Sequence, residues 1–103
     1  MRLRRYVLPA AFAALTLPAQ AQDAGSLQAA GLAATCANCH GTQGRVVGSA
    51  LPSLAGMPKE AMLEQLRAFK SGSRPATIMH QLAKGYTDAQ LEQIAGYFSR
   101  QAR

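Results

Sequence analysis

The sequence predicts an all-α fold, a small domain built of helices and loops. Apolar residues recur at helical spacing in three separate segments, and segments rich in glycine or proline lie between them. No window of four or more residues alternates as a half-buried strand does while being rich in β-branched and aromatic residues. The chain has 103 residues, with three tyrosines, three phenylalanines and no tryptophan, so it is too short for a multi-domain enzyme.

The first 21 residues have the pattern of a secretory signal peptide. Three arginines lie within residues 1–5, an uncharged run covers residues 6–18, and Ala19-Gln20-Ala21 forms a small-x-small cleavage site. We expect residues 1–21 to be the signal peptide and residues 22–103 the single mature domain, located in the periplasm. A membrane span needs ~20 apolar residues, so no span is expected after cleavage, and an uncleaved anchor is the alternative.

The net charge of +6 is partly a property of this leader. Residues 22–103 carry eight Lys or Arg against five Asp or Glu, which is a charge of +3. A strong basic surplus is the usual signature of nucleic-acid binding, so this function is not expected of the mature domain.

The first two helices are predicted from capping and breaking residues. Residues 26–35 are rich in alanine and leucine, and Ser26 at the start of this segment is a candidate helix cap. Residues 41–57 contain four glycines and one proline and are predicted to be a loop. Pro58 suits the first position of a second helix, which the Ser-Gly-Ser sequence at 71–73 ends. The buried face of this helix is formed by Met62, Leu63, Leu66 and Phe69.

Residues 74–87 are predicted to be irregular, with one short turn at 80–83, and a final helix covers residues 87–101. Thr87 and Gln90 have the spacing of a capping box. The apolar stripe of this helix is Leu91, Ile94, Ala95 and Phe98. The loop at 41–57 is long for so small a domain, and a planar apolar cofactor would supply the missing interior.

Cys36 and Cys39, followed directly by His40, form the Cys-x-x-Cys-His signature of c-type haem attachment. Each thiol adds across one haem vinyl group, and the two intervening residues span the distance between the vinyls. His40 then reaches the iron from one side. The prediction is one covalent haem c.

Three other interpretations of the motif are less favoured. A thioredoxin-like pair needs a neighbouring βαβ pattern, which is absent from the sequence. A zinc site needs further ligands, and only one more histidine, His80, is present. A structural disulfide between Cys36 and Cys39 would close a very small ring and leave His40 without a role.

The second axial ligand of the iron is predicted to be Met79. A thioether suits the low-spin iron of an electron carrier, and Met79 lies in the irregular segment with a helix between it and His40. Met57 is too close to His40 in sequence, and Met62 lies on the apolar stripe of a helix. His80 is the rival ligand.

The order of helix, haem motif, loop, helix, methionine segment and terminal helix resembles the class I c-type cytochromes over residues 22–103. The resemblance implies that Pro52 offers its carbonyl to His40, a bond that would fix the orientation of the ring and tune the iron. It also implies that the first and last helices cross at a small residue and an aromatic residue, and Tyr97 matches the aromatic. Ala29 stands where a glycine is common in the family.

A narrower pattern in residues 51–56, 64–72 and 74–79 resembles the cytochrome subunits of flavocytochrome c sulfide dehydrogenases. This resemblance implies an FAD-containing flavoprotein as partner, and an electron-accepting role for this chain in sulfide oxidation. The chain itself shows no nucleophile–base pair and no paired carboxylates, so no catalytic residue is expected on it.

Electron transfer at an exposed haem edge is the leading functional hypothesis. A free-standing shuttle is the first alternative, and a five-coordinate haem that binds gases or acts as a peroxidase is the second. The candidate cations around the haem edge are Lys59, Arg67, Lys70, Arg74 and Lys84. Arg74 is the candidate for a contact with a haem propionate, because Pro75 holds it close to the methionine segment.

Overall fold

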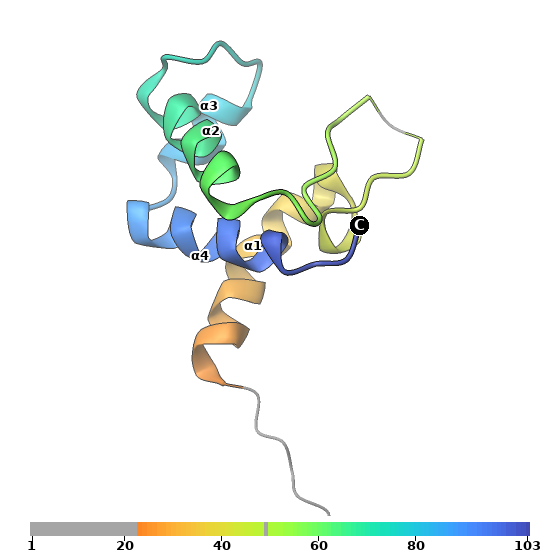
Figure 1. The fold of residues 1–103 in the computed structure, drawn as a ribbon. Helices are drawn as coiled ribbons and strands as arrows, with labels where there is room; N and C mark the ends of the chain where they lie inside the picture. Colours follow the sequence, from red (N-terminus) through yellow and green to blue (C-terminus); the bar gives the residue numbers. More distant parts are fainter. Residues whose placement is uncertain (1–22, 49) are drawn as a thin grey trace, which may run out of the picture.

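The computed structural model describes residues 23–48 and 50–103, and the predicted signal peptide lies outside them. Four α-helices and one short 3₁₀ helix follow in order, and no strand occurs in this part of the chain (Figure 1). They are α1 (Ala24–His40), η1 (Thr42–Gly44), α2 (Lys59–Ser71), α3 (Met79–Lys84) and α4 (Asp88–Ser99). The all-α prediction is confirmed.

Helix α1 is longer than predicted at both ends. It begins after Asp23, whose side chain accepts the Gly25 N–H at 3.2 Å, so the prediction of Ser26 as the cap was wrong. The helix continues through the cysteine motif to His40, because no glycine or proline lies between Thr35 and Gly41. Gly41, with a φ of 82°, then ends the helix.

The other boundaries differ from the predictions by one or two residues. Pro58 is the residue before α2 rather than its first residue, and Gly72 ends α2 in the left-handed conformation. The turn predicted at 80–83 is helix α3, which already begins at Met79. The capping box of α4 is confirmed, since Thr87 Oγ1 accepts the Gln90 N–H at 3.2 Å and Gln90 Oε1 accepts the Thr87 N–H at 2.8 Å.

The core lies where α1, α2 and α4 meet. Helix α1 packs on α4, while α2 packs on both α3 and α4. The predicted stripe of α4 is confirmed, because all four of its residues are at most 2% exposed. The buried cluster consists of Ala33, Met62, Leu63, Leu91, Ile94, Ala95 and Phe98. Ala29 on α1 and Gly96 on α4 are buried, and Tyr97 packs against the cluster with its ring edge-on to Phe98.

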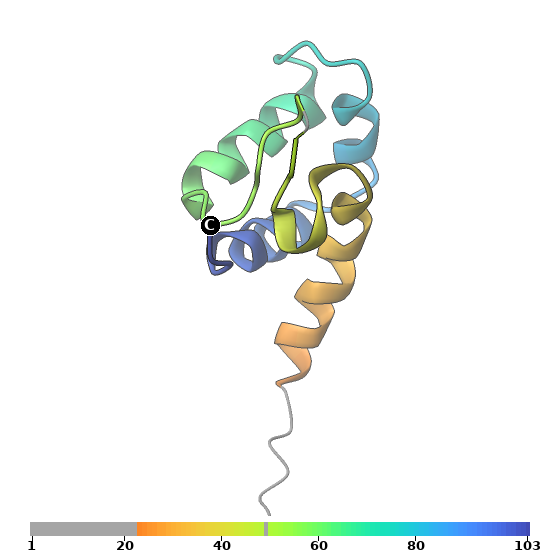
Figure 2. The same cartoon turned by 90° about the vertical axis from the view of Figure 1, so that its right-hand side faces the viewer.

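The loop between α1 and α2 extends from one side of the molecule, at the right in Figure 1 and toward the viewer in Figure 2. The segment 72–78 and α3 stand at the upper left of Figure 1, away from this loop. The C-terminus returns to the base of the loop, where the Gly56 N–H donates to the Phe98 carbonyl at 2.9 Å. The α1–α2 loop and α3 are therefore attached to the same set of packed helices, α1, α2 and α4, at separate places.

Candidate functional site

His40 is the last residue of α1 and is only 7% exposed. Its Nδ1 lies 2.8 Å from the Pro52 carbonyl oxygen. A carbonyl can only accept, so Nδ1 carries the proton, and Nε2 keeps the lone pair that a metal ligand needs. The contact places the imidazole in a defined orientation.

The loop reaches His40 because it folds back on Gly44. The Gly44 carbonyl accepts the N–H groups of Leu54 and Ala55 at 2.8 and 3.2 Å and the Ser53 hydroxyl at 2.8 Å. These bonds hold the segment that contains Pro52 beside the end of α1. Gly44 itself has a φ of 78°, and an added Cβ would lie 2.7 Å from the Phe98 ring. Sequence analysis did not single out Gly44, although its place in a glycine-rich loop was a signal.

The two cysteines occupy the last turns of α1, immediately before His40. Cys36 is half-buried and packs against the core, whereas Cys39 is exposed. Burial raises the pKa of the Cys36 thiol, so this thiol stays protonated at neutral pH. Both sulfurs and the imidazole are therefore carried by the C-terminal end of one helix, α1.

The three methionines of residues 50–103 have different surroundings. Met62 is 3% exposed and belongs to the core cluster, as predicted. Met57 packs against that cluster. Met79 is half-buried at the start of α3 and is absent from the cluster and from the residues that pack on it. The helical core therefore uses two methionine side chains and does not use the third.

The donor set and the apolar surroundings fit a haem. A buried imidazole with an available Nε2 and two adjacent thiols are the groups that covalent haem requires. Four large apolar side chains are exposed on the α1–α2 loop and on or beside α3, where a planar cofactor would cover apolar surface. They are Val47, Leu51, Ile78 and Leu82.

The basic residues expected around the haem edge are partly engaged within the protein. Arg67 pairs with Glu92 at 3.4 Å, and Lys70 pairs with Asp88 at 2.8 Å, so both cations join α2 to α4. Their place around the haem edge stays a prediction, and the ion pairs with α4 show that neither side chain is free of contacts within the protein. The Arg74 guanidinium lies 4.6 Å from the centre of the Phe69 ring and also donates to Gln65. Its contact with a propionate stays a prediction.

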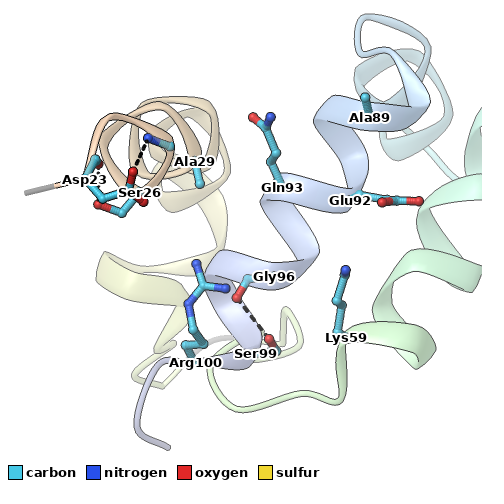
Figure 3. Close-up of a pocket in the computed structure, with 11 residues that line it drawn as sticks. Asp23, Ser26, Ala29, Lys59, Ala89, Glu92, Gln93, Gly96, Ser99 and Arg100 are labelled. Carbon is cyan, nitrogen blue, oxygen red and sulfur yellow. Dashed lines mark hydrogen bonds between the residues drawn. The ribbon is translucent and has the colours of Figure 1, made fainter.

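A groove of about 700 Å³ lies between the N-terminal half of α1 and α4 (Figure 3). Ser26 and Ala29 of α1 line it together with Asp23, the residue before that helix. From the other side it is lined by Gln93 and Gly96 of α4 and by Arg100, the residue after α4. None of the residues of the Cys-x-x-Cys-His segment lines this groove. The groove is therefore separate from the candidate site.

An all-α domain with this Cys-x-x-Cys-His helix end and an oriented histidine belongs to the class of covalent haem proteins. The family model "Cytochrome c" matches residues 28–101, and the chain belongs to this family. The family membership confirms the class I cytochrome c fold and the haem c cofactor that the sequence predicts. The protein carries a cytochrome c electron-transfer domain.

Among its relatives, the chain is similar to the cytochrome subunit of sulfide dehydrogenase from Chlorobaculum tepidum, with 45% identity over 67 residues. That alignment covers 65% of this chain and 60% of the relative. A thiosulfate dehydrogenase electron acceptor from Thiomonas intermedia is 39% identical over 69 residues, or 66% of this chain and 32% of the relative. Cytochrome c-554(548) from Halomonas halodenitrificans is 33% identical over 70 residues, or 65% of this chain and 84% of the relative.

The chain thus spans 60% of the length of the sulfide dehydrogenase subunit and 27% of a cytochrome c-552 from Acidithiobacillus ferridurans. Within residues 23–48 and 50–103, no helix combines the length and apolar character needed to cross a membrane.

Proposed function

We propose that this protein is a periplasmic electron-transfer cytochrome with one haem c attached through Cys36 and Cys39, whose iron is bound axially by His40 and Met79. When bound, the haem supplies one-electron chemistry between ferric and ferrous iron. The residues of the chain provide two thioether bonds, an oriented imidazole and a soft sulfur ligand. With both axial positions filled, no substrate reacts at the metal.

The observation that carries this proposal is the position of Met79. Met79 is the first residue of the short helix α3 and does not belong to the core cluster. Met62 belongs to that cluster, and Met57 packs against it. A methionine that the core does not need is available to the iron, and a thioether suits an electron carrier. The Pro52 carbonyl supports the opposite ligand by holding the His40 ring in one orientation.

Replacement of Met79 tests the axial ligation. Met79→Ala should abolish the weak long-wavelength sulfur-to-iron absorption band of the ferric protein and allow carbon monoxide to bind the ferrous form readily. Met57→Ala is the matched control and should leave both properties unchanged. If the band survives in Met79→Ala and is lost in Met57→Ala, the axial ligand is Met57 and the assignment to Met79 is wrong. A wild-type protein that lacks the band and binds carbon monoxide freely would favour a five-coordinate haem protein instead.

We further propose that the chain accepts electrons from an FAD-containing flavoprotein in a sulfide-oxidising complex. The support is the 45% identity to a sulfide dehydrogenase cytochrome subunit. A free-standing shuttle is the alternative, and the similarity to thiosulfate dehydrogenase electron acceptors leaves the donor open to other reduced sulfur compounds. Purification from the native periplasm should give a complex with bound flavin, and a haem protein that is consistently free of flavin would contradict the complex.

A further inference from the structure

The turn between α3 and α4 is tied to the haem-attachment end of α1 through one side chain, Tyr86. Its hydroxyl lies 2.5 Å from Thr35 Oγ1, a contact that joins residues 51 positions apart. Thr35 directly precedes Cys36, and Tyr86 lies two residues after the end of α3, the helix that Met79 begins. The bond therefore connects the segments that carry the two sides of the proposed haem site.

Tyr86 is also held at its backbone. Its N–H donates to the Ala83 carbonyl at 3.2 Å, which joins it to the last turn of α3. Its carbonyl accepts from Lys70 Nζ at 2.8 Å, which joins it to α2, and Lys70 in turn pairs with Asp88 on α4. The ring is partly buried against the core. Tyr86 is thus hydrogen-bonded to three helices, α1, α2 and α3, and its position is well determined before any cofactor is considered.

The anchoring of α3 explains why this junction matters. Helix α3 has six residues, and Ala83 is the one among them that is buried. On its N-terminal side, the exposed residues 72–75 are held to α2, since the Arg74 N–H donates to the Ala68 carbonyl at 3.1 Å and the Arg74 guanidinium stacks on Phe69. Helix α3 packs mainly on α2, whereas α1 packs mainly on α4. The Tyr86–Thr35 bond links α1 directly to the end of α3.

We propose that Tyr86 and Thr35 are positioning residues that keep the Met79 thioether at the iron by fixing α3 relative to the haem-attachment helix. This inference rests on the proposed ligation by His40 and Met79. Breaking the bond would let α3 move away from α1 and would make the thioether easier to displace. The hydroxyl pair touches neither axial ligand, so its effect would be exerted through the spacing of the two helices.

The test measures how fast imidazole displaces the thioether in the ferric holoprotein, followed by loss of the sulfur-to-iron band. Tyr86→Phe keeps the ring and Thr35→Val keeps the side-chain shape, while each removes the hydrogen bond. Each should accelerate displacement roughly 2- to 10-fold, the range that one hydrogen bond supplies. The double variant should be no faster than Thr35→Val alone, because Thr35→Val already removes the Tyr86 bond together with the 3.2 Å donation from Thr35 Oγ1 to the Leu32 carbonyl.

Two controls separate positioning from general destabilisation. Thr35→Ser restores a hydroxyl at the same place and should displace at the wild-type rate. Tyr97→Phe removes a hydroxyl from the other ring that packs against the core and should also leave the rate unchanged. Unchanged displacement in Tyr86→Phe, additive effects in the double variant, or equal acceleration in Tyr97→Phe would overturn the inference. A wild-type protein without the band would instead contradict the proposed axial ligation.

Discussion

Gly44 controls the orientation of His40 although it does not touch the imidazole. Its carbonyl gathers three donors from residues 53–55, and this arrangement returns Pro52 to the end of α1. The backbone at Gly44 has a φ of 78°, which residues with a Cβ rarely adopt. A single glycine therefore decides whether the loop can hold the histidine ring.

Replacing Gly44 by alanine should destabilise the protein more than an ordinary glycine replacement. The new Cβ would lie 2.7 Å from Phe98 Cδ1 and 2.9 Å from the Ala55 nitrogen, in addition to the unfavourable φ. We expect a loss of roughly 2–4 kcal/mol in the free energy of unfolding of the holoprotein, measured by denaturant titration.

Gly72→Ala is the matched control, because Gly72 has a φ of 82° and no atom within 4 Å of its added Cβ. It should lose only the backbone contribution, about 1–2 kcal/mol. Equal losses in the two variants would show that the close approach to Phe98 has no energetic consequence.

Helix α4 is the best-defined element of the fold because both its start and its buried face are specified locally. The capping box satisfies backbone N–H groups at its first turn, and the stripe of four apolar residues faces the core. The pairs of Arg67 with Glu92 and Lys70 with Asp88 then fasten its outer side to α2. Local and tertiary interactions support the same helix.

Thr87→Ala should remove the cap of α4 and lower the free energy of unfolding by about 1 kcal/mol, within a usual range of ~0.5–2 kcal/mol. Thr87→Ser keeps an oxygen that can accept the Gln90 N–H and should retain most of the stability. Denaturant midpoints of the three holoproteins give the comparison. A loss in Thr87→Ser equal to that in Thr87→Ala would mean that the threonine acts through its methyl group.

The ion pair of Lys70 with Asp88, between α2 and α4, should make the stability of the protein depend on pH. The hydrogen bond from Lys70, and then its charge, hold the pKa of the Asp88 carboxyl below its ordinary value of 3.8. Because the pKa is lowered in the folded state, the stabilisation is present above pH 3.8 and is lost as pH falls further.

Wild type should therefore be more stable than Asp88→Asn at pH 7 and 5, and the difference should shrink at pH 3. Denaturant midpoints at the three pH values measure it. The difference at pH 7 should also decrease in 1 M salt, since Asp88 is solvent-exposed. A difference that stays constant down to pH 3 would rule out the ion pair as its source.

We expect the domain to need its cofactor in order to fold. The buried cluster has seven residues, and the loop between α1 and α2 exposes Val47 almost completely, at 95%. So small an apolar core offsets only part of the conformational entropy lost on ordering the chain. Haem would bury the exposed apolar side chains of the loop and of α3 together.

We accordingly expect haem-free protein, made as the Cys36→Ala/Cys39→Ala double variant, to lack a cooperative thermal unfolding transition. Holoprotein should unfold in one transition followed by far-ultraviolet circular dichroism. A sharp, cooperative melt of the haem-free variant would show that the helical core suffices without the cofactor.

Much of the fold could be predicted from the sequence because its signals act over a few residues. The box of Thr87 and Gln90, the stop at Gly72 and the stripe of α4 are set by neighbours within two helical turns, and the structure contains all three. The cysteine spacing likewise specified the haem c cofactor, since thioether attachment is a local covalent requirement. The first cap was misassigned to Ser26 because Asp23 competes for the same role three positions earlier.

The contacts around the site could not be predicted from the sequence where the two residues in contact are far apart along the chain. The paired state of Arg67 and Lys70 depends on α4 lying against α2, and the Thr35–Tyr86 bond depends on α1 meeting the end of α3. No periodicity encodes such pairs, because they arise from how helices pack and not from the order of neighbouring residues. The sequence by itself determined the helices, the haem motif and the available methionines, and the packing decided which side chains surround them.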